Sequence, residues 1–460
     1  MLLPGRNVVR SDFFDWYTNK MKTNNRFILL ATCIAAFGGI LFGYDTAVIS
    51  GAIPGIRSYF SLNEYYLGWA VSSILVGCAI GAAVAGIVAD KYGRRIGLMA
   101  CAIFFAVSGV GAGLSDSLTG FILFRMIGGL GVGASAMLSP MYIAEMALPK
   151  WRGRLVAVYQ LAIVFGILVA YFANFIFESW GHNSWRWMLA SQTVPSILFL
   201  SLLFLVPETP RWLIMKRRNT AARKVLEKMK GDENVEHEMM VIEKSFQGTT
   251  GSWKQLCNRK YRSVIVVGIL IAVFLQVTGI NAILYYAPVI FKETGLDNTT
   301  SLMQTIGIGG INMAATFVAI GLVDRVGRRA LFLYGLVLMG ISLFVVGFCF
   351  QAGYFDHYIV LIFMLLYVAA FGSTLGAVGW VYLSEIFPNA IRSRALALAT
   401  LVLWIADFVV TLTFPILTRH VGTSCTLFCY AALCAVAFVY MLLKLKETKG
   451  RSLEEIETFF

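Results

Sequence analysis

The sequence predicts an all-α membrane protein in which twelve transmembrane helices form two pseudo-symmetric bundles of six. Three observations predict this fold: an apolar composition, a series of long apolar segments, and two local motifs that each occur twice. Of the 460 residues, 58% are hydrophobic and only 14% are charged, whereas about a quarter of the residues of a soluble globular protein are charged. A chain of this composition is suited to burial in lipid.

Twelve apolar segments are long enough to cross a bilayer, which takes about 20 residues as a helix. Only helices and closed barrels satisfy every backbone polar group in lipid. The segments are continuously apolar rather than alternating, which predicts helices. They are residues 27–51, 67–89, 97–114, 120–143, 155–177, 186–206, 264–290, 302–323, 330–351, 358–384, 395–418 and 423–443.

Two polar motifs recur in the same order in the second half of the chain. The run Asp90-Lys-Tyr-Gly-Arg-Arg recurs as Asp324-Arg-Val-Gly-Arg-Arg. The run Tyr142-Ile-Ala-Glu, followed by Arg-Gly-Arg, recurs as Leu383-Ser-Glu, followed by Arg-Ser-Arg. All four lie in short gaps between apolar segments. A duplicated half with charged connections is typical of a membrane transporter built from two repeats.

The apolar segments and the repeat divide the chain into five parts. We expect a cytoplasmic N-terminal segment (1–26), a six-helix bundle (27–206), a cytoplasmic helical linker (207–262), a second bundle (263–443) and a cytoplasmic tail (444–460). The linker is either a solvated connection that steadies the two bundles or a regulatory domain.

The net charge of +13 could suggest a nucleic-acid partner, but its distribution argues against one. Lys and Arg concentrate in the gaps after the second, fourth, eighth and tenth segments, whereas the short gaps on the opposite side hold only Arg57, Arg186, Lys292 and Arg419. This asymmetry predicts a multi-pass protein of the cell (inner or plasma) membrane with both termini in the cytoplasm. The eight cysteines show neither metal-ligand spacing nor a disulfide framework.

Two ionisable residues of opposite sign lie inside predicted helices, Asp45 in the first and Arg125 in the fourth. A charge at the helix centre costs at least ~2.5 kcal/mol, so each residue needs a partner. Separating an aspartate from its arginine favours proton uptake by the aspartate. The pair therefore either couples proton binding to a conformational change or forms a static ion pair between helices.

A third buried carboxylate is expected at Asp407, in the eleventh segment. It is a candidate for a second proton site, for a hydrogen-bond acceptor of the substrate, or for a structural group.

Neutral polar and aromatic side chains also lie within the apolar segments. Carboxamides donate and accept hydrogen bonds, and an indole offers an apolar face with one N–H donor. This mixture suits a sugar rather than an anion; the alternative is hydrogen bonding between helices. The residues are Gln160, Gln276, Thr278, Asn281, Asn312, Trp380 and Trp404, with Tyr285 one helical turn from Asn281.

The duplicated motifs place acidic residues among arginines at the cytoplasmic ends of helices. Salt bridges between the two halves would close an inner gate there, although the arginines alone would also serve orientation. The candidate gating residues are Asp90, Arg94, Arg95, Glu145, Arg152, Arg154, Asp324, Arg328, Arg329, Glu385, Arg392 and Arg394. No phosphate loop, zinc spacing or Gly-x-Ser-x-Gly motif is present, so we expect neither an enzyme nor a resident metal or cofactor.

These motifs, taken together, resemble those of the sugar porter family of the major facilitator superfamily, over nearly the whole chain. The matching stretches are Phe42-Gly-Tyr-Asp45, Asp90 to Arg95, Glu145 to Arg154, Pro207-Glu-Thr-Pro-Arg211, Thr278-Gly-Ile-Asn281, Asp324 to Arg329 and Ser384-Glu-Ile-Phe387. The chain looks most like the bacterial proton-linked pentose and hexose carriers. The resemblance implies symport of a monosaccharide with a proton, by alternating access between two six-helix domains.

The resemblance also implies roles for single residues. Asp45 corresponds to the proton-coupling aspartate of the family, where facilitative animal carriers have asparagine, and Arg125 corresponds to its partner. The positions that contact sugar correspond to Gln160, Gln276, Asn281, Tyr285, Asn312 and Trp380, and those that line the pocket to Phe42, Phe371, Gly376 and Trp404.

The chain departs from the family pattern in and around the expected pocket. Leu275 replaces a glutamine, Leu403 replaces a glutamine or asparagine, and Ala377 replaces a proline. Asp407 stands where asparagine is common, and Gln192 stands where the xylose carrier has glutamate. Sugar hydroxyls that meet apolar walls lose hydrogen bonds, so we expect a substrate other than xylose or glucose, such as a deoxy sugar or a sugar in another pose.

Two other functions remain open from the sequence. A uniporter for a sugar or polyol would keep Asp45 as a structural residue. A sugar sensor that does not transport is the other alternative, although such sensors typically carry long cytoplasmic extensions.

Overall fold

The helices of the computed structural model follow the apolar segments of the sequence. It describes residues 23–148, 151–230, 235–245, 256, 258–354, 357–388 and 391–449. The first half contains α2 (Thr23–Tyr59), α3 (Glu64–Tyr92), α4 (Arg94–Leu114), α5 (Leu118–Met146), α6 (Arg152–Glu178), α7 (Ser184–Ser191) and α8 (Thr193–Leu203). Three short helices follow: α9 (Pro210–Met215), α10 (Asn219–Lys230) and α11 (Val235–Ser245).

The second half begins with a 3₁₀ turn, Arg259–Tyr261, and repeats this plan. It contains α13 (Arg262–Val277), α14 (Ile280–Glu293), α15 (Asn298–Val326), α16 (Arg328–Ala352), α17 (His357–Ser373), α18 (Leu375–Ile386), α19 (Arg392–His420) and α20 (Gly422–Lys444).

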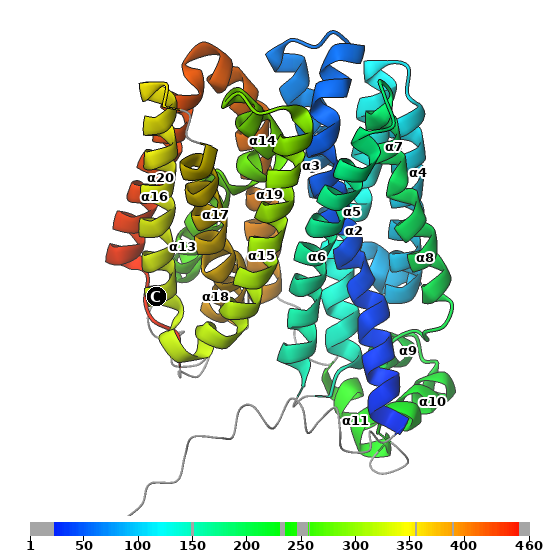
Figure 1. The fold of residues 1–460 in the computed structure, drawn as a ribbon. Helices are drawn as coiled ribbons and strands as arrows, with labels where there is room; N and C mark the ends of the chain where they lie inside the picture. Colours follow the sequence, from blue (N-terminus) through cyan, green and yellow to red (C-terminus); the bar gives the residue numbers. More distant parts are fainter. Residues whose placement is uncertain are drawn as a thin grey trace, which may run out of the picture.

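The helices form two bundles that stand side by side (Figure 1). We call α2–α8 the N-half and α13–α20 the C-half. Helices α9–α11 lie below the N-half, and we call this the linker end of the molecule and the opposite one the far end. Within the described residues, eleven helical segments are long and apolar enough to cross a membrane, and α7 with α8 makes the twelfth crossing. The predicted fold class is confirmed.

The sixth predicted segment, 186–206, is not one continuous helix. It divides into α7 and α8 at Gln192. Pro195 has no backbone N–H, so the carbonyl of Ser191, four residues earlier, cannot receive its helical hydrogen bond. The prediction of an unbroken helix was wrong here, because it relied on the hydropathy of the segment and did not take account of Pro195.

Two further predicted segments are broken in the middle of the C-half. Residues 264–290 divide into α13 and α14 at Gly279, whose φ of 95° is left-handed, a conformation that glycine adopts without a Cβ clash. Residues 358–384 divide into α17 and α18 at Thr374, whose φ and ψ are −129° and −92°. Both breaks free backbone groups at the depth of the candidate site, which proteins tolerate where the backbone is buried in protein or lines a cavity.

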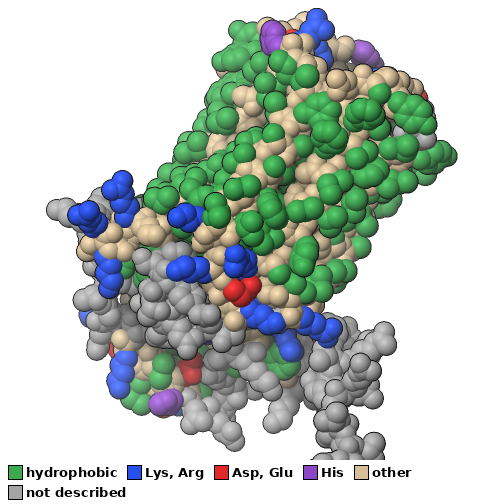
Figure 2. All heavy atoms as spheres, turned by 90° about the vertical axis from the view of Figure 1, so that its left-hand side faces the viewer, with side chains coloured by type: hydrophobic (Ala, Val, Ile, Leu, Met, Phe, Trp, Pro, Cys, Tyr) green, Lys and Arg blue, Asp and Glu red, His purple; other side chains and the backbone are tan. Residues whose placement is uncertain are grey.

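On the face of the molecule shown in Figure 2, hydrophobic side chains form a broad belt. The exposed large hydrophobic residues of the protein include Ile87 and Leu443, each more than two-thirds exposed, as expected for side chains that face lipid. Lys and Arg side chains gather below this belt. The surface is therefore that of a protein that spans a membrane.

Glycines allow the central helices of the N-half to cross closely. A Cβ on Gly43 of α2 would lie 1.9 Å from the carbonyl oxygen of Ile163 in α6, and one on Gly166 of α6 would lie 2.1 Å from that of Ile40 in α2. Such contacts between small residues fix the separation of helices in lipid. This crossing holds the part of α2 that carries Asp45.

The two halves touch in the part of the molecule nearer the far end. Toward the far end, the Tyr171 hydroxyl of α6 donates to the carbonyl of Leu284 in α14 over 2.9 Å, and Trp69 of α3 packs edge-on against Phe408 of α19. At the far end, Arg419 of α19 lies 3.8 Å from the carboxylate of Glu64 on α3. These contacts tie the halves together at the far end.

Candidate functional site

Asp45 and Arg125 form a buried ion pair inside the N-half. The Nη1 atom of Arg125, on α5, donates to Oδ1 of Asp45, on α2, and the two side chains are 0% and 1% exposed. The other carboxylate oxygen, Oδ2, has no hydrogen-bond partner among the described residues. A Cβ on Gly128 would lie 2.8 Å from this oxygen. Glycine therefore leaves room for a carboxyl group with one oxygen available for a proton.

A chain of polar side chains crosses the middle of the C-half. The Asn281 amide nitrogen donates to Oε1 of Gln276 over 2.9 Å and to Oδ2 of Asp407 over 2.7 Å. The Thr411 hydroxyl donates to Oδ1 of Asp407 over 3.2 Å. The break at Gly279 makes this possible, because it places Gln276 at the end of one helix and Asn281 at the start of the next.

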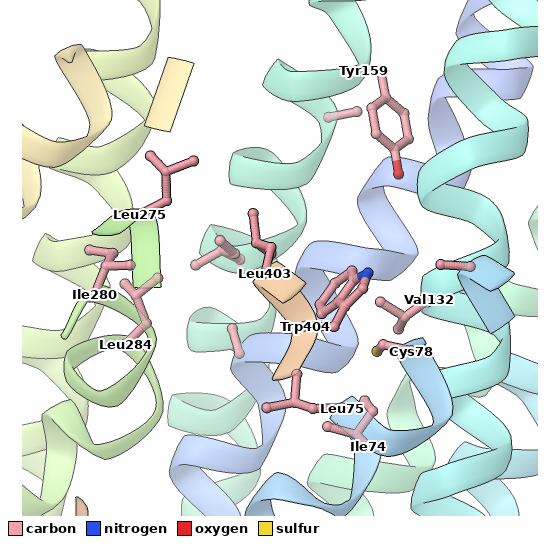
Figure 3. Close-up of a cluster of buried hydrophobic side chains, with 14 of the residues drawn as sticks. Ile74, Leu75, Cys78, Val132, Tyr159, Leu275, Ile280, Leu284, Leu403 and Trp404 are labelled. Carbon is pink, nitrogen blue, oxygen red and sulfur yellow. The ribbon is translucent and has the colours of Figure 1, made fainter. Parts of the chain in front are cut away.

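Aromatic side chains from both halves meet beside this chain. The rings of Phe42, on α2, and Trp404, on α19, lie 5.8 Å apart at an angle of 48°. Trp404 projects from α19 toward Cys78 and Val132 of the N-half (Figure 3). Its Nε1 is buried and has no hydrogen-bond partner within the described residues. An apolar ring face with an unused donor suits the apolar face and the hydroxyls of a sugar.

The structure places most of the remaining predicted site residues around the breaks in the C-half, and it places Gln160 on α6 of the N-half. Phe371 packs against Gly376 across the break between α17 and α18, and the Asn312 carboxamide packs against Gly372. Trp380 is 42% exposed, Tyr285 is buried and Gln160 is half-buried. Within the described residues, no hydrogen bond joins the side chains of Gln160, Asn312 or Trp380 to the Asn281 chain.

Leu275 and Leu403 are the two leucines that stand where the family pattern has polar residues. Both are 4% exposed. Leu275 packs against Gly379 of α18. Both leucines belong to the apolar cluster drawn around Trp404 (Figure 3). Both are buried apolar side chains at positions where the family resemblance leads us to expect hydrogen-bonding groups.

At the linker end, the N-half contains a network of ionic and hydrogen bonds. Arg94 lies 3.1 Å from the carboxylate of Glu145 and 3.3 Å from that of Asp90. The Thr209 hydroxyl donates to Glu145 over 2.6 Å. Glu208 accepts the backbone N–H of Arg94 and of the next residue, each over 3.0 Å. The segment after α8 is thereby fixed to the start of α4.

The C-half contains the matching network. Arg328 lies 3.0 Å from Glu385, whose carboxylate accepts the Thr448 hydroxyl over 2.6 Å. Glu447 accepts the backbone N–H of Arg328 over 2.9 Å and that of the next residue over 3.0 Å. The predicted partner Asp324 has a side chain outside the described part of the chain. These ion pairs lie within one half, as do those of the N-half.

The other predicted gating arginines bond mostly to nearby backbone. Arg95 donates to the carbonyl of Leu203, and Arg329 to that of Leu442. Arg152 and Arg392 donate to the carbonyls of Ala144 and Phe387. Arg154 lies over the ring of Trp151, and Arg394 is half-buried.

Sequence reasoning missed the roles of Glu208 and Glu447. Each follows the last membrane helix of its half and accepts N–H groups at the start of a helix, where the helix dipole favours an anion. Burial raises the pKa of Glu208. Burial also opposes ionisation of Glu447, but backbone N–H donors outweigh it and hold its pKa below the usual value. The repeated Glu-Thr pair at 208–209 and 447–448 was the signal.

The fold and the central site define a membrane transporter with two related halves. Residues 31–460 match the family model described as "Sugar (and other) transporter". The chain is 38% identical to the arabinose-proton symporter of Bacillus subtilis, over 94% of each chain. It is also 38% identical to the D-xylose-proton symporter of Escherichia coli K12, over 95% of this chain and 96% of the relative. The chain therefore belongs to the sugar transporter family of the major facilitator superfamily.

Solved structures of a sugar transporter share this fold. A partially occluded inward-open structure of the E. coli xylose transporter matches with a TM-score of 0.84 at 37% identity, covering 93% of this chain and 100% of that one. The same transporter bound to 6-bromo-6-deoxy-D-glucose scores 0.77 at 38% identity, covering 95% and 99%. The inward-open structure is the more similar of these two.

Proposed function

We propose that this protein carries a monosaccharide across the cell membrane together with protons, by alternating access. The buried Asp45–Arg125 pair, with one unpartnered carboxylate oxygen, is the observation that carries the proposal. Proton-coupled relatives that transport arabinose and xylose support it. The aromatic and carboxamide groups in the middle of the molecule supply suitable contacts for a sugar.

In this mechanism, a proton binds Asp45 and weakens its attraction to Arg125. Sugar binds chiefly to the C-half, through Gln276 and Asn281, with Trp404 against its apolar face. The halves then rock about the central site, as expected for two repeats around a fixed binding site. Return of the empty carrier requires Asp45 to release its proton and pair again with Arg125.

The networks at the linker end act as the inner gate in this proposal. In the present conformation their ion pairs stay within each half, and Glu64 and Arg419 approach each other at the far end. Closing the linker end would bring Asp90, Glu145 and the paired arginines of the two halves together. Opening the far end would separate Glu64 from Arg419.

We assign the linker end to the cytoplasm, because Lys and Arg concentrate there. With it, we propose that both termini are cytoplasmic and that the protein lies in the cell (inner or plasma) membrane. The proposed domain bounds are 1–26, 27–206, 207–262, 263–443 and 444–460, as an N-terminal segment, a bundle, a linker, a bundle and a tail.

The substrate follows from the apolar replacements near the polar chain. Leu275 and Leu403 cannot donate or accept hydrogen bonds, and a buried hydroxyl without a partner costs about 1–3 kcal/mol. A sugar that lacks a hydroxyl at these positions, or that turns it elsewhere, avoids this cost. We therefore propose a deoxy sugar, or a sugar in another pose, in preference to xylose or glucose.

The test is the external pH of lightly buffered, energy-depleted cells that express the protein. Arabinose, D-xylose, D-glucose, 2-deoxy-D-glucose and myo-inositol are added in turn. We expect the medium to become more alkaline with the transported sugar, and the response to shrink in Asp45→Asn but not in Asp116→Asn, an exposed aspartate at the far end. Uptake of labelled sugar without a pH change would identify a uniporter instead.

A further inference from the structure

Asp407 is a second buried carboxyl group, and it differs from Asp45 in having no cation. It lies on α19 and is 1% exposed. Its two oxygens accept hydrogen bonds only from neutral donors, the Asn281 amide and the Thr411 hydroxyl. Among the described residues, no ion pair involves Asp407. A buried carboxylate held only by neutral donors is easily converted to the neutral acid when it loses one of them.

No cation within the described part of the chain pairs with Asp407; Arg125 of α5 interacts electrostatically with Cys78 and Tyr285, but it is paired with Asp45. From α3, the thiol of Cys78 lies within electrostatic reach of both Asp407 and Asp45. From α14, Tyr285 lies within reach of Asp407, and the hydroxyl of Tyr286 donates to the Thr411 carbonyl. The charged side chains of α13, α18 and α20 stand at their linker ends, Arg262, Glu385 and Lys444.

The Asn281 amide connects this carboxyl group to the proposed sugar site. An amide nitrogen has two hydrogens, and both are in use, one toward Gln276 and one toward Asp407. Asn281 is half-buried whereas Asp407 is buried behind it. A sugar hydroxyl that accepts a hydrogen bond from Asn281 must therefore take a hydrogen from one of these two acceptors.

Loss of this donor has unequal consequences for the two acceptors. The Gln276 oxygen is neutral, so it tolerates the change or accepts a sugar hydroxyl. The Asp407 carboxylate would keep a single neutral donor in apolar surroundings, which strongly disfavours the charged form. Binding a proton from the open aqueous side converts it to a neutral carboxylic acid.

We propose that Asp407 is a second proton carrier, which takes up a proton when the sugar claims the amide hydrogen that Asn281 otherwise donates to it. Two protons then move with each sugar, one on Asp45 and one on Asp407. When the sugar leaves on the other side, the Asn281 amide returns to Asp407 and the proton is released there. This inference rests on the proposed function, since it adds a second proton to the same transport cycle.

The test is the number of protons carried per sugar by the purified full-length protein in liposomes. Labelled arabinose, 2-deoxy-D-glucose, D-xylose and D-glucose serve in turn as probes. An outward sugar gradient is opposed by a pH gradient, and the pH gradient at which net flux is zero gives the ratio. We expect a ratio of two for the unaltered protein, one for Asp407→Asn, one for Asp45→Asn, and no coupling in the double variant.

The possible results separate this inference from the function on which it rests. A ratio of one that Asp407→Asn leaves unchanged overturns the second carrier and leaves proton symport standing. A ratio of zero in the unaltered protein overturns both. A purely structural role for Asp407 would lower the transport rate without changing the ratio.

A second variant keeps the inference testable if Asp407→Asn does not fold. Thr411→Val removes the other neutral donor, so Asp407 should bind its proton more readily, and the pH at which sugar-induced proton uptake is half-maximal should rise. The matched control is Thr305→Val, a buried threonine of α15 whose hydroxyl bonds to its own helix. An equal pH midpoint in the two variants would overturn the proposal.

Discussion

At the scale of single residues, two buried carboxylates in one molecule have different electrostatic surroundings: Asp45 is paired with a cation, and Asp407 is held by neutral donors. The sequence predicted a pair between Asp45 and Arg125, because two isolated charges of opposite sign in apolar helices each need a partner. It left Asp407 open among three roles. What distinguishes those roles is the identity of the groups that face α19 from α3 and α14, and no local pattern encodes that.

Removing Arg125 should destabilise the protein more than removing both members of the pair. Arg125→Leu leaves Asp45 buried without its cation, and breaking a buried pair costs about 3–5 kcal/mol of unfolding free energy. In the double variant with Asp45→Asn, most of this loss should be recovered. Thermal unfolding in detergent measures both, and a double variant no more stable than Arg125→Leu would contradict the expectation.

At the scale of helices, hydropathy located the membrane segments but not the breaks within them. Pro195 and Gly279 were visible in the sequence, yet long apolar segments often tolerate both residues in membrane helices. The break at Thr374 carries neither residue, and tertiary packing decides it. The caps formed by Glu208 and Glu447 were equally hard to predict, since each reaches a helix more than a hundred positions away in the chain.

The close crossing of α2 and α6 predicts a sharp difference between two glycine substitutions. A Cβ at Gly43 would overlap the Ile163 carbonyl, whereas a Cβ at Gly86 of α3 has no heavy atom within 4 Å. Gly43→Ala should therefore cost about 1–3 kcal/mol through overpacking, and Gly86→Ala should cost nothing measurable. The unfolding temperatures of the two variants provide the measurement, and equal temperatures would contradict the close approach of α2 and α6 at Gly43.

The two helix caps should respond differently to pH. The folded-state pKa of Glu447 is lowered, so its carboxylate stabilises the fold above the unfolded pKa of about 4.5. Glu447→Gln should cost about 1 kcal/mol at neutral pH, as for loss of a helix cap. The difference from the unaltered protein should vanish as the pH falls through the folded-state pKa, where the native residue is protonated too.

Glu208 provides the matched comparison for this prediction. Its folded-state pKa is raised, so the stabilisation from its protonated form is complete below about pH 4.5 and is lost as the pH rises through the raised value. Glu208→Gln resembles the protonated form and should cost less than Glu447→Gln at neutral pH. Unfolding temperatures of both variants across the pH range check this order, and the reverse order would count against it.

At the scale of the whole molecule, the duplicated motifs were enough to predict two six-helix halves. They were not enough to predict the conformation, because the same helices are present in every state of a rocking transporter. What distinguishes the states is which end of the molecule holds the contacts between halves. Here the contact between Glu64 and Arg419 lies at the far end.

Weakening that contact should shift the conformational equilibrium modestly. The Arg419 side chain is 72% exposed, and exposed ion pairs contribute at most about 1 kcal/mol. Arg419→Ala should thus increase the population open at the far end by no more than about fivefold. Distances between spin labels at the far ends of α2 and α19 measure this population.

The control for this measurement is Arg223→Ala. Arg223 pairs with Glu227 within α10 and does not join the halves, so its loss should leave the label distances unchanged. Equal behaviour of the two variants would show that the far-end ion pair does not hold the halves together.

The matching networks at the linker end have a consequence for how the chain can be made. Helix α9 attaches to the N-half through the Trp212 indole, which donates to the Asp90 carbonyl, and the segment after α20 attaches to the C-half through Glu447. Each half is therefore a complete unit, because the segment that follows its last membrane helix binds back to it at the linker end. A gene cut between α11 and α13 should yield two polypeptides that assemble in one membrane and restore uptake.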